Sequence, residues 1–110
     1  MFRFIQCPKC FSMIETHSCK SCGIKDVFHT DERIVKQEVY NGYLVSTVHT
    51  IIDHDMTGKG SLWFETMVFK GKEVSSDSVY VERCQYHKEA VLQHEEAKMI
   101  IDKGPFGVNS

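Results

Sequence analysis

The sequence lacks the features that would assign it to several protein classes at once. It has no apolar run approaching the roughly 20 residues that span a bilayer, so we expect no transmembrane helix. Proline accounts for only 2 of the 110 residues and glycine for 7, while 11% are aromatic, which excludes a fibrous repeat and a disordered chain. The formal charge of −2 argues against a protein that binds mainly phosphate groups. The apolar run at the start breaks at Gln6 and reaches cysteines immediately, so we expect no secretory signal.

Cysteine, by contrast, is abundant, and four of the five cysteines form two C-x2-C pairs separated by eight residues. The pairs are Cys7 with Cys10 and Cys19 with Cys22. Each C-x2-C turn can direct two sulfurs toward one centre, and two such turns joined by a short hairpin complete a tetrahedron of thiolates. The spacing predicts one structural Zn²⁺ held by these four residues. Iron in a rubredoxin-like site and His17 in place of one cysteine stay open as alternatives.

The motifs Cys7-Pro8-x-Cys10 and Cys19-x-x-Cys22-Gly23 resemble the two knuckles of zinc-ribbon modules, over residues 5–24. Such a resemblance implies nucleic-acid binding, protein docking or a purely structural role. Residues 1–30 hold four basic and two acidic side chains, and residues 31–110 hold nine basic and thirteen acidic ones. Four thiolates with one Zn²⁺ add a charge of about −2, which makes the ribbon about neutral and disfavours nucleic acid as the partner.

The remainder of the chain predicts four strands and one helix. The strands are expected at 34–40, 43–52, 62–69 and 79–85, and the helix at 87–102. Asn41-Gly42 favours a tight hairpin between the first two strands, and Gly104-Pro105 ends the helix. The expected fold class is therefore α+β, with a zinc-ribbon module at 1–30 and a domain at 31–110. In that domain one C-terminal helix packs on a four-stranded antiparallel meander.

The third strand is largely apolar on both faces, which is unusual for an antiparallel sheet with one side in water. Its two sets of alternating side chains are Leu62, Phe64, Thr66 and Val68, and Trp63, Glu65, Met67 and Phe69. One helix covers one face, with a stripe formed by Ala90, His94, Ala97 and Ile101. We expect the other face to be covered by the ribbon with Phe2, Phe4 and Phe11, by a partner protein, or by a second copy of the chain.

Four side chains are weak candidates for a second site: Asp53, His54, Glu65 and His94. If the helix packs near the strand ends, they could converge, with His49 as an alternative to His54, as a metal site or an acid–base pair. The stronger alternative places His94 in the core with one nitrogen hydrogen-bonded, and pairs Glu65 with Arg83 across the sheet.

The fifth cysteine, Cys84, lies on the expected fourth strand. A nucleophilic cysteine needs a nearby base, and His87 or His94 could supply one. A lone cysteine on a strand is more often a small buried hydrophobe, and this is the interpretation we favour. The sequence therefore favours a protein without a catalytic residue.

A further pattern covers residues 45–97. It consists of Ser46-Thr47-Val48, Asp53-His54, the run Phe64–Phe69, Glu82-Arg83, Glu89-Ala90 and His94. This pattern resembles a family of small uncharacterised proteins of phages, prophages and some bacteria. Cys84 stands where that family has a tyrosine, and Tyr86 where it has a threonine suited to capping a helix. The resemblance implies a phage-encoded accessory protein in the host cytoplasm and implies no catalytic role.

Together these features predict a non-enzymatic, zinc-stabilised accessory protein that acts by protein–protein binding, as a modulator or inhibitor of a host enzyme or defence complex. The expected partner is another protein, or a second copy, on the apolar sheet face, and no membrane. Two alternatives remain: a nucleic-acid-binding zinc ribbon, and a small metal-dependent hydrolase or nuclease that uses Asp53, His54, Glu65 and His94.

Overall fold

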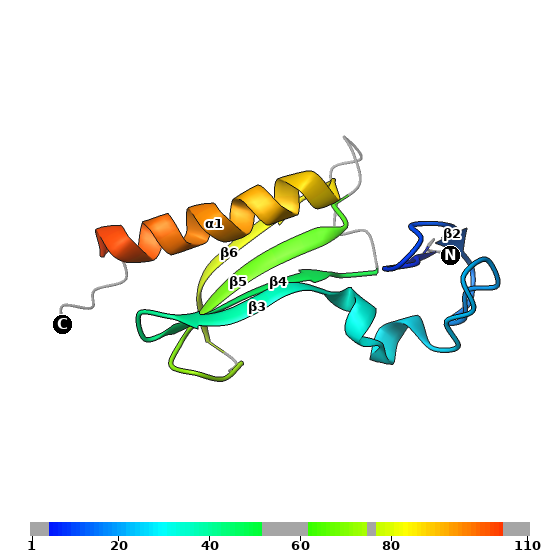
Figure 1. The fold of residues 1–110 in the computed structure, drawn as a ribbon, viewed down its shortest axis with the longest axis horizontal. Helices are drawn as coiled ribbons and strands as arrows, with labels where there is room; N and C mark the ends of the chain where they lie inside the picture. Colours follow the sequence, from blue (N-terminus) through cyan, green and yellow to red (C-terminus); the bar gives the residue numbers. More distant parts are fainter. Residues whose placement is uncertain (1–4, 52–61, 75–76, 105–110) are drawn as a thin grey trace.

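The computed structural model describes residues 5–51, 62–74 and 77–104. Two short strands and two 3₁₀ turns precede four longer strands and one helix (Figure 1). The strands are β1 (Ile5–Gln6), β2 (Met13–Ile14), β3 (Ile34–Tyr40), β4 (Tyr43–His49), β5 (Phe64–Lys70) and β6 (Ser78–Cys84). The 3₁₀ turns are η1 (Val27–His29) and η2 (Asp31–Arg33), and the helix is α1 (His87–Lys103). The predicted α+β class and element order are confirmed.

The large sheet is an antiparallel meander with the strand order β3-β4-β5-β6. Asn41 and Gly42 form the turn between β3 and β4, with φ angles of 48° and 84°. Both residue types tolerate this left-handed backbone, which matches the twist of the two strands. The predicted hairpin is therefore confirmed. The second strand ends at His49 rather than at residue 52, and Ile51 already has a φ of 74°.

Helix α1 covers one face of this sheet (Figure 1). Its buried stripe is the predicted one, and Ala90 and Ala97 have no exposed surface because small side chains let the helix approach the strands closely. The main apolar cluster beneath the helix consists of Tyr43, Val45, Val68, Ala97 and Ile101. Within the described residues, no helix is long and apolar enough to cross a membrane.

The ends of α1 are fixed by two different devices. Tyr86 supplies no side-chain cap, and the Glu89 carboxylate instead accepts the Tyr86 backbone N–H at 3.0 Å. At the other end, Gly104 adopts a left-handed φ of 74° and donates its N–H to the Ile101 carbonyl. The carboxylate at the first turn also complements the helix dipole, which offsets the poor capping residue noted in the sequence.

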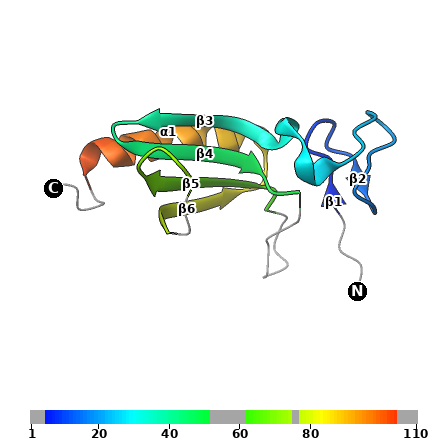
Figure 2. The same cartoon turned by 90° about the horizontal axis from the view of Figure 1, so that it is seen from below.

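The cysteine-bearing segment lies beyond one end of the sheet (Figures 1 and 2). The expectation that it packs over the second sheet face is therefore wrong for its described residues, and Phe2 and Phe4 lie outside them. We call the face opposite α1 the helix-free face. Side-chain alternation places Val39, Val79 and Val81 on it, and these valines are 48%, 39% and 40% exposed.

Candidate metal centre

The four predicted cysteine ligands meet at one point. Cys7 Sγ lies 3.5 Å from Cys22 Sγ, and Cys10 Sγ lies 3.5 Å from Cys19 Sγ, so each contact joins the two C-x2-C turns. All four sulfurs lie within 4.8 Å of one another, and none is in a disulfide. In a tetrahedral zinc tetrathiolate with Zn–S bonds of about 2.3 Å, neighbouring sulfurs lie about 3.8 Å apart. The donor set and its geometry fit one structural Zn²⁺.

The two turns that carry these cysteines share one backbone pattern. In the first, Phe11 N–H donates to the Cys7 carbonyl at 2.9 Å, and in the second, Gly23 N–H donates to the Cys19 carbonyl at 2.9 Å. The residue after the second cysteine is left-handed in both, with a φ of 62° at Phe11 and 87° at Gly23. Glycine adopts this conformation without cost, whereas phenylalanine is strained there. The sequence signalled the second turn through its glycine but gave no such signal for the first.

The thiols differ in how readily they ionise. Burial raises the pKa of Cys7 to about 12, since this side chain has no exposed surface. The hydroxyl and backbone N–H of Ser12 lower the pKa of Cys10 to about 6. Thiolates packed this closely repel one another unless a cation lies between them, so a metal at this point would displace protons and bind in a pH-dependent way.

Four protein ligands fill a tetrahedral metal, so the site leaves no position for a substrate or an activated water. His17, the alternative ligand, is exposed and lies outside the cysteine group. The arrangement can therefore stabilise the fold but does not supply an open metal for catalysis. It defines a zinc-ribbon-like module at the end of a four-stranded sheet.

The cysteine module is joined to the sheet through the end of β4. Ile51 packs in one apolar cluster with Cys7, Cys19 and Val27, and its carbonyl accepts the Gln6 backbone N–H at 2.9 Å. The metal centre thus shares its core with a residue that directly follows the large sheet.

His49, the last residue of β4, strengthens this junction. Its Nδ1 accepts the Ile51 N–H at 2.9 Å, so its Nε2 carries the proton and donates to Gln6 Oε1 at 2.6 Å. Burial, and then the charges of Arg33 and His87, lower the pKa of His49 to about 4. A neutral imidazole with one fixed tautomer therefore links the strand to the module.

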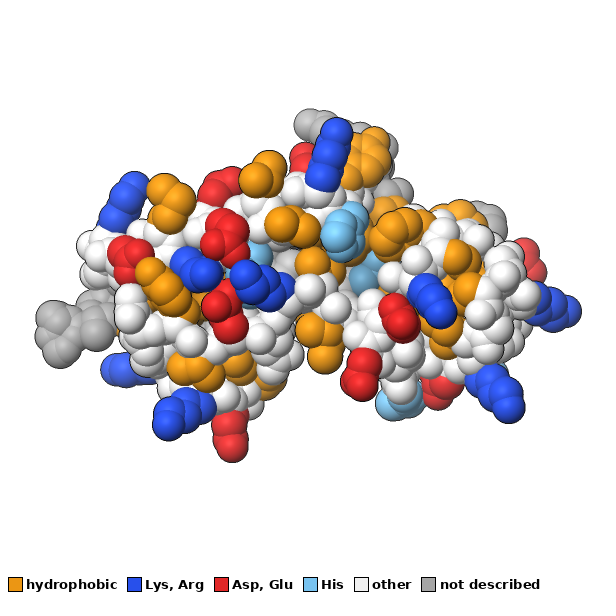
Figure 3. Space-filling view, in the orientation of Figure 1, with side chains coloured by type: hydrophobic (Ala, Val, Ile, Leu, Met, Phe, Trp, Pro, Cys, Tyr) orange, Lys and Arg blue, Asp and Glu red, His pale blue; other side chains and the backbone are white. Residues whose placement is uncertain are grey.

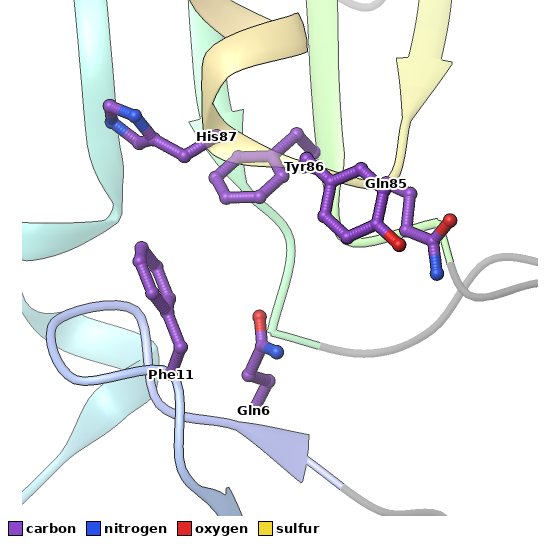
Figure 4. A pocket seen from close by; sticks show the side chains of 6 residues that line it. Gln6, Phe11, Gln85, Tyr86 and His87 are labelled. Atoms are coloured by element: carbon purple, nitrogen blue, oxygen red, sulfur yellow. The ribbon is translucent and has the colours of Figure 1, made fainter.

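Phe11 also crosses the junction, and Figure 4 shows its ring pointing from the cysteine turn toward His87 at the start of α1. The ring stacks on His49 with centroids 6.0 Å apart and meets Phe64 edge-on at 6.2 Å. A cavity of about 150 Å³ lies beside Phe11 and is also lined by Phe64, His87, Gln6 and Tyr86 (Figure 4). The contacts place Phe11 at the end of the sheet on the α1 side, and not on the helix-free face.

The candidates for a second site are not gathered into one. His94 has no exposed surface, and both of its ring nitrogens are bonded at 2.8 Å, Nδ1 to Thr47 Oγ1 and Nε2 to Glu38 Oε2. Glu65 lies on the helix-free face, where Arg83 donates to it at 2.8 and 2.9 Å. The sheet therefore separates Glu65 from His94. Asp53 and His54 lie outside the described residues.

The surroundings of His94 form a polar network that the sequence did not indicate. Thr66 Oγ1 lies 2.8 Å from Thr47 Oγ1, which continues the chain from His94 into the sheet. On the solvent side of this network, Lys36 and Lys98 each lie 3.4 Å from Glu38 Oε2. Acidic and basic side chains gather on this part of the surface, between α1 and β3 (Figure 3). His94, followed by Lys36, lowers the pKa of Glu38. Ammonium groups hold the positions around this carboxylate that a metal ion would need.

Cys84 packs against Trp63, Phe64 and Ala90, as the sequence favoured, although it is half-buried and not fully enclosed. Burial, followed by the charges of Glu89 and Glu82, raises its pKa to about 11. The thiol is therefore protonated at neutral pH, and a protonated thiol is a poor nucleophile.

No protein-family profile, curated protein or solved structure matches this chain. The class that the fold and the site define is thus an α+β protein with an N-terminal four-cysteine, zinc-ribbon-like module. The resemblance of residues 45–97 to phage proteins is therefore supported by its sequence pattern and by no family or homologue match.

Proposed function

We propose that this chain is a non-enzymatic, zinc-stabilised protein that acts by binding another protein through its helix-free face. The observation that carries the proposal is the exposure of Val39, Val79 and Val81 on that face, which α1 and the described part of the ribbon leave uncovered. The exposed valines lie on the two outer strands, β3 and β6, and exposed apolar side chains on an open sheet face are typical of a protein-binding surface. The ion pair of Glu65 with Arg83 adds a polar element beside them.

The zinc in this proposal has a structural role. It would hold two cysteine turns whose core includes Ile51, and it would thereby fix the end of β4. Small modules of this kind gain much of their folding free energy from the metal. Structural zinc, rather than iron, is the proposed occupant because a closed site of four thiolates is the usual ligand set of structural Zn²⁺.

Protein binding is favoured over the two alternatives by charge and by geometry. A zinc-loaded chain has a net charge of about −4, which opposes binding to phosphate backbones. The hydrolase would need His94 and Glu65 in one site, and they lie on opposite faces of the sheet with their own partners. The residue pattern at 45–97 supports the narrower proposal of a phage-encoded modulator of a host enzyme or defence complex.

Lysine substitutions on the helix-free face test the proposal. A double variant, Val39→Lys with Val81→Lys, should abolish capture of a partner from host lysate while leaving zinc content and circular dichroism unchanged. Val91→Lys is the matched control, because Val91 is 44% exposed on α1. Sedimentation velocity on the purified protein shows whether the partner is a second copy. Equal recovery of the same partner by wild type and the double variant would contradict the proposal.

A further inference from the structure

A second surface, independent of the helix-free face, lies between the outer edge of β6 and α1. It is an open groove of about 470 Å³ whose walls include Tyr80 and Glu82 from β6 and Glu89, Gln93 and Glu96 from α1. Leu92, which is 63% exposed, also borders it. Three features of this groove point to one kind of occupant.

The first feature is the free edge of the sheet. β6 is the last strand in the order β3-β4-β5-β6, and within residues 5–51, 62–74 and 77–104 no strand pairs with its outer side. An exposed edge presents backbone N–H and C=O groups at the spacing of another strand. Extended peptides bind such edges by adding a strand, with alternate side chains entering the adjacent groove.

The second feature is the charge of the groove. Glu82, Glu89 and Glu96 line it, and the one lining cation, Arg83, is bound to Glu65 on the opposite face of the sheet. These carboxylates also act on their neighbours. Burial and then Glu82 and Glu96 raise the pKa of Tyr80, and burial, with smaller contributions from Glu89 and Glu82, raises the pKa of Cys84. The groove therefore favours a cationic occupant.

The third feature is an unpartnered hydrogen-bond acceptor. Gln93 lines the groove and is only 9% exposed, yet its Oε1 atom is buried without a hydrogen-bond partner. Buried polar atoms of this kind are rare in folded proteins, because each costs about 1–3 kcal/mol when left unsatisfied. Because this atom has almost no exposed surface, the Gln93 amide must turn toward the groove before a donor from an occupant can satisfy it.

The spacing of the acidic groups distinguishes between cationic occupants. Among the described residues, the carboxylates of Glu82, Glu89 and Glu96 do not form a group within 4.8 Å, as metal ligands would. They instead extend from the edge of β6 across two turns of α1. Separated charges along an open groove fit several basic side chains on one extended segment better than a single ion.

We propose that the groove between β6 and α1 binds an extended peptide segment of a partner protein, which adds as a strand to β6 and places Lys or Arg side chains against Glu82 and Glu96. The remaining side chains on the groove-facing side of the segment contact Leu92 and the ring of Tyr80, which line the same groove as Glu82. The N–H or guanidinium donors of the segment bond to the Gln93 carbonyl oxygen once its amide has turned toward the groove. This surface is separate from the helix-free face, so the two sites can be tested one at a time.

The test is a selection from a random 12-residue peptide library displayed on phage, with the zinc-loaded full-length chain as bait. We expect enriched sequences in which Lys or Arg recurs at alternate positions, the spacing at which side chains of an added strand face the groove. The double variant Glu82→Lys with Glu96→Lys should bind a selected peptide at least about tenfold more weakly, which corresponds to a loss of roughly 1.4 kcal/mol in binding free energy. Glu15→Lys on the ribbon and Val39→Lys on the helix-free face are the controls, and both should bind within about twofold of wild type.

Amide chemical shifts of the labelled protein then locate the peptide. Shift changes confined to β6 and α1, together with retained affinity in the controls, support the inference. It is overturned if selection enriches no basic sequences, if the charge-reversed variant binds as tightly as wild type, or if the shift changes map to β3 or the ribbon. Val39 lies on β3, away from β6, so Val39→Lys alone can lose partner capture while it keeps peptide binding, and the two proposals fail separately.

Discussion

Phe11 and Gly23 occupy the same position in the two cysteine turns, one residue after the second cysteine, with φ angles of 62° and 87°. Only glycine adopts this backbone without strain. The first turn therefore carries a conformational cost at Phe11, and the cost is offset by the contacts of its ring with His49 and Phe64. The asymmetry shows that the first turn makes an aromatic contact with the sheet that the second turn, with glycine at this position, does not make.

The first prediction concerns these paired positions. Phe11→Gly removes about 1 kcal/mol of backbone strain. It loses about 1 kcal/mol of ring burial, because the ring is 44% exposed, and glycine adds about 1 kcal/mol of entropy to the unfolded chain, so we expect a net loss of stability of about 1 kcal/mol. Gly23→Ala is the matched change, because a Cβ there meets nothing within 4 Å and its cost of about 1–2 kcal/mol is purely conformational. Urea unfolding at a buffered free-zinc concentration measures both. A Phe11→Gly variant more stable than wild type would contradict this role of the ring.

The second prediction concerns pH. The pKa of His49 is lowered to about 4 by burial, whereas in the unfolded chain it is about 6.5. The neutral form is therefore favoured by folding, and its stabilisation is fully present above pH 6.5 and is lost as the pH falls from 6.5 to 4. The whole effect is about 3 kcal/mol.

NMR titration of the His49 ring protons measures this directly, and we expect no protonation above pH 5. The pH dependence of the free energy of unfolding in urea gives the number of protons taken up when the chain unfolds. Between pH 4 and 6 this number should be about one lower for His49→Gln than for wild type, since glutamine does not titrate. A His49 that titrates near pH 6.5 in the folded protein would show that the imidazole is not held neutral between Ile51 and Gln6.

The third prediction separates a core histidine from a catalytic or metal-binding one. His94→Ala removes the partner of both Thr47 and Glu38 and leaves a cavity, so the free energy of unfolding should fall by about 2–4 kcal/mol. Zinc content should be unchanged, because His94 lies far along α1 from the cysteine module. Thr47→Ser keeps the hydroxyl that contacts Nδ1 and should cost about 1 kcal/mol. Loss of one metal equivalent in His94→Ala would instead assign His94 to a second metal site.

The fourth prediction concerns Cys84. Its pKa of about 11 leaves about a hundredth of the thiolate that an ordinary cysteine has at pH 8. In the zinc-loaded protein, a disulfide reagent such as dithionitrobenzoate should therefore react with it about a hundredfold more slowly than in the urea-unfolded chain. The Cys84→Ser variant lacks this thiol, so the part of the reaction that it loses belongs to Cys84. Rapid reaction in the folded wild type that is absent from Cys84→Ser would show an activated thiol.

Local sequence signals predicted most of the fold because each has a direct physical cause. Asn41-Gly42 fixes the hairpin since both residues accept a positive φ, and Gly104 ends the helix for the same reason. The four-cysteine cluster was also predictable, because the spacing of two C-x2-C units allows few other arrangements of the sulfurs. The division of the chain near residue 30 stays a prediction.

The placement of the ribbon was not predictable, because it depends on contacts between distant residues. Apolar content alone suggested that Phe11 covers the second sheet face, whereas its left-handed backbone directs the ring to His49 at the end of the sheet. Likewise, His94 and Glu65 looked like potential partners along the sequence. Strand alternation and helix packing put them on opposite faces, which becomes apparent only once the register of β4 with β5 is known.

The central claim is that one structural Zn²⁺ holds the four cysteines and, through Ile51 and Gln6, the end of β4. The most direct measurement is the metal content of the purified protein by inductively coupled plasma mass spectrometry, for wild type and Cys22→Ser, with amide exchange of both. The account predicts one zinc per wild-type chain, none in Cys22→Ser, and loss of amide protection at Gln6 and Ile51 in the variant. Absence of zinc from wild type, or a full zinc equivalent in Cys22→Ser, would contradict it.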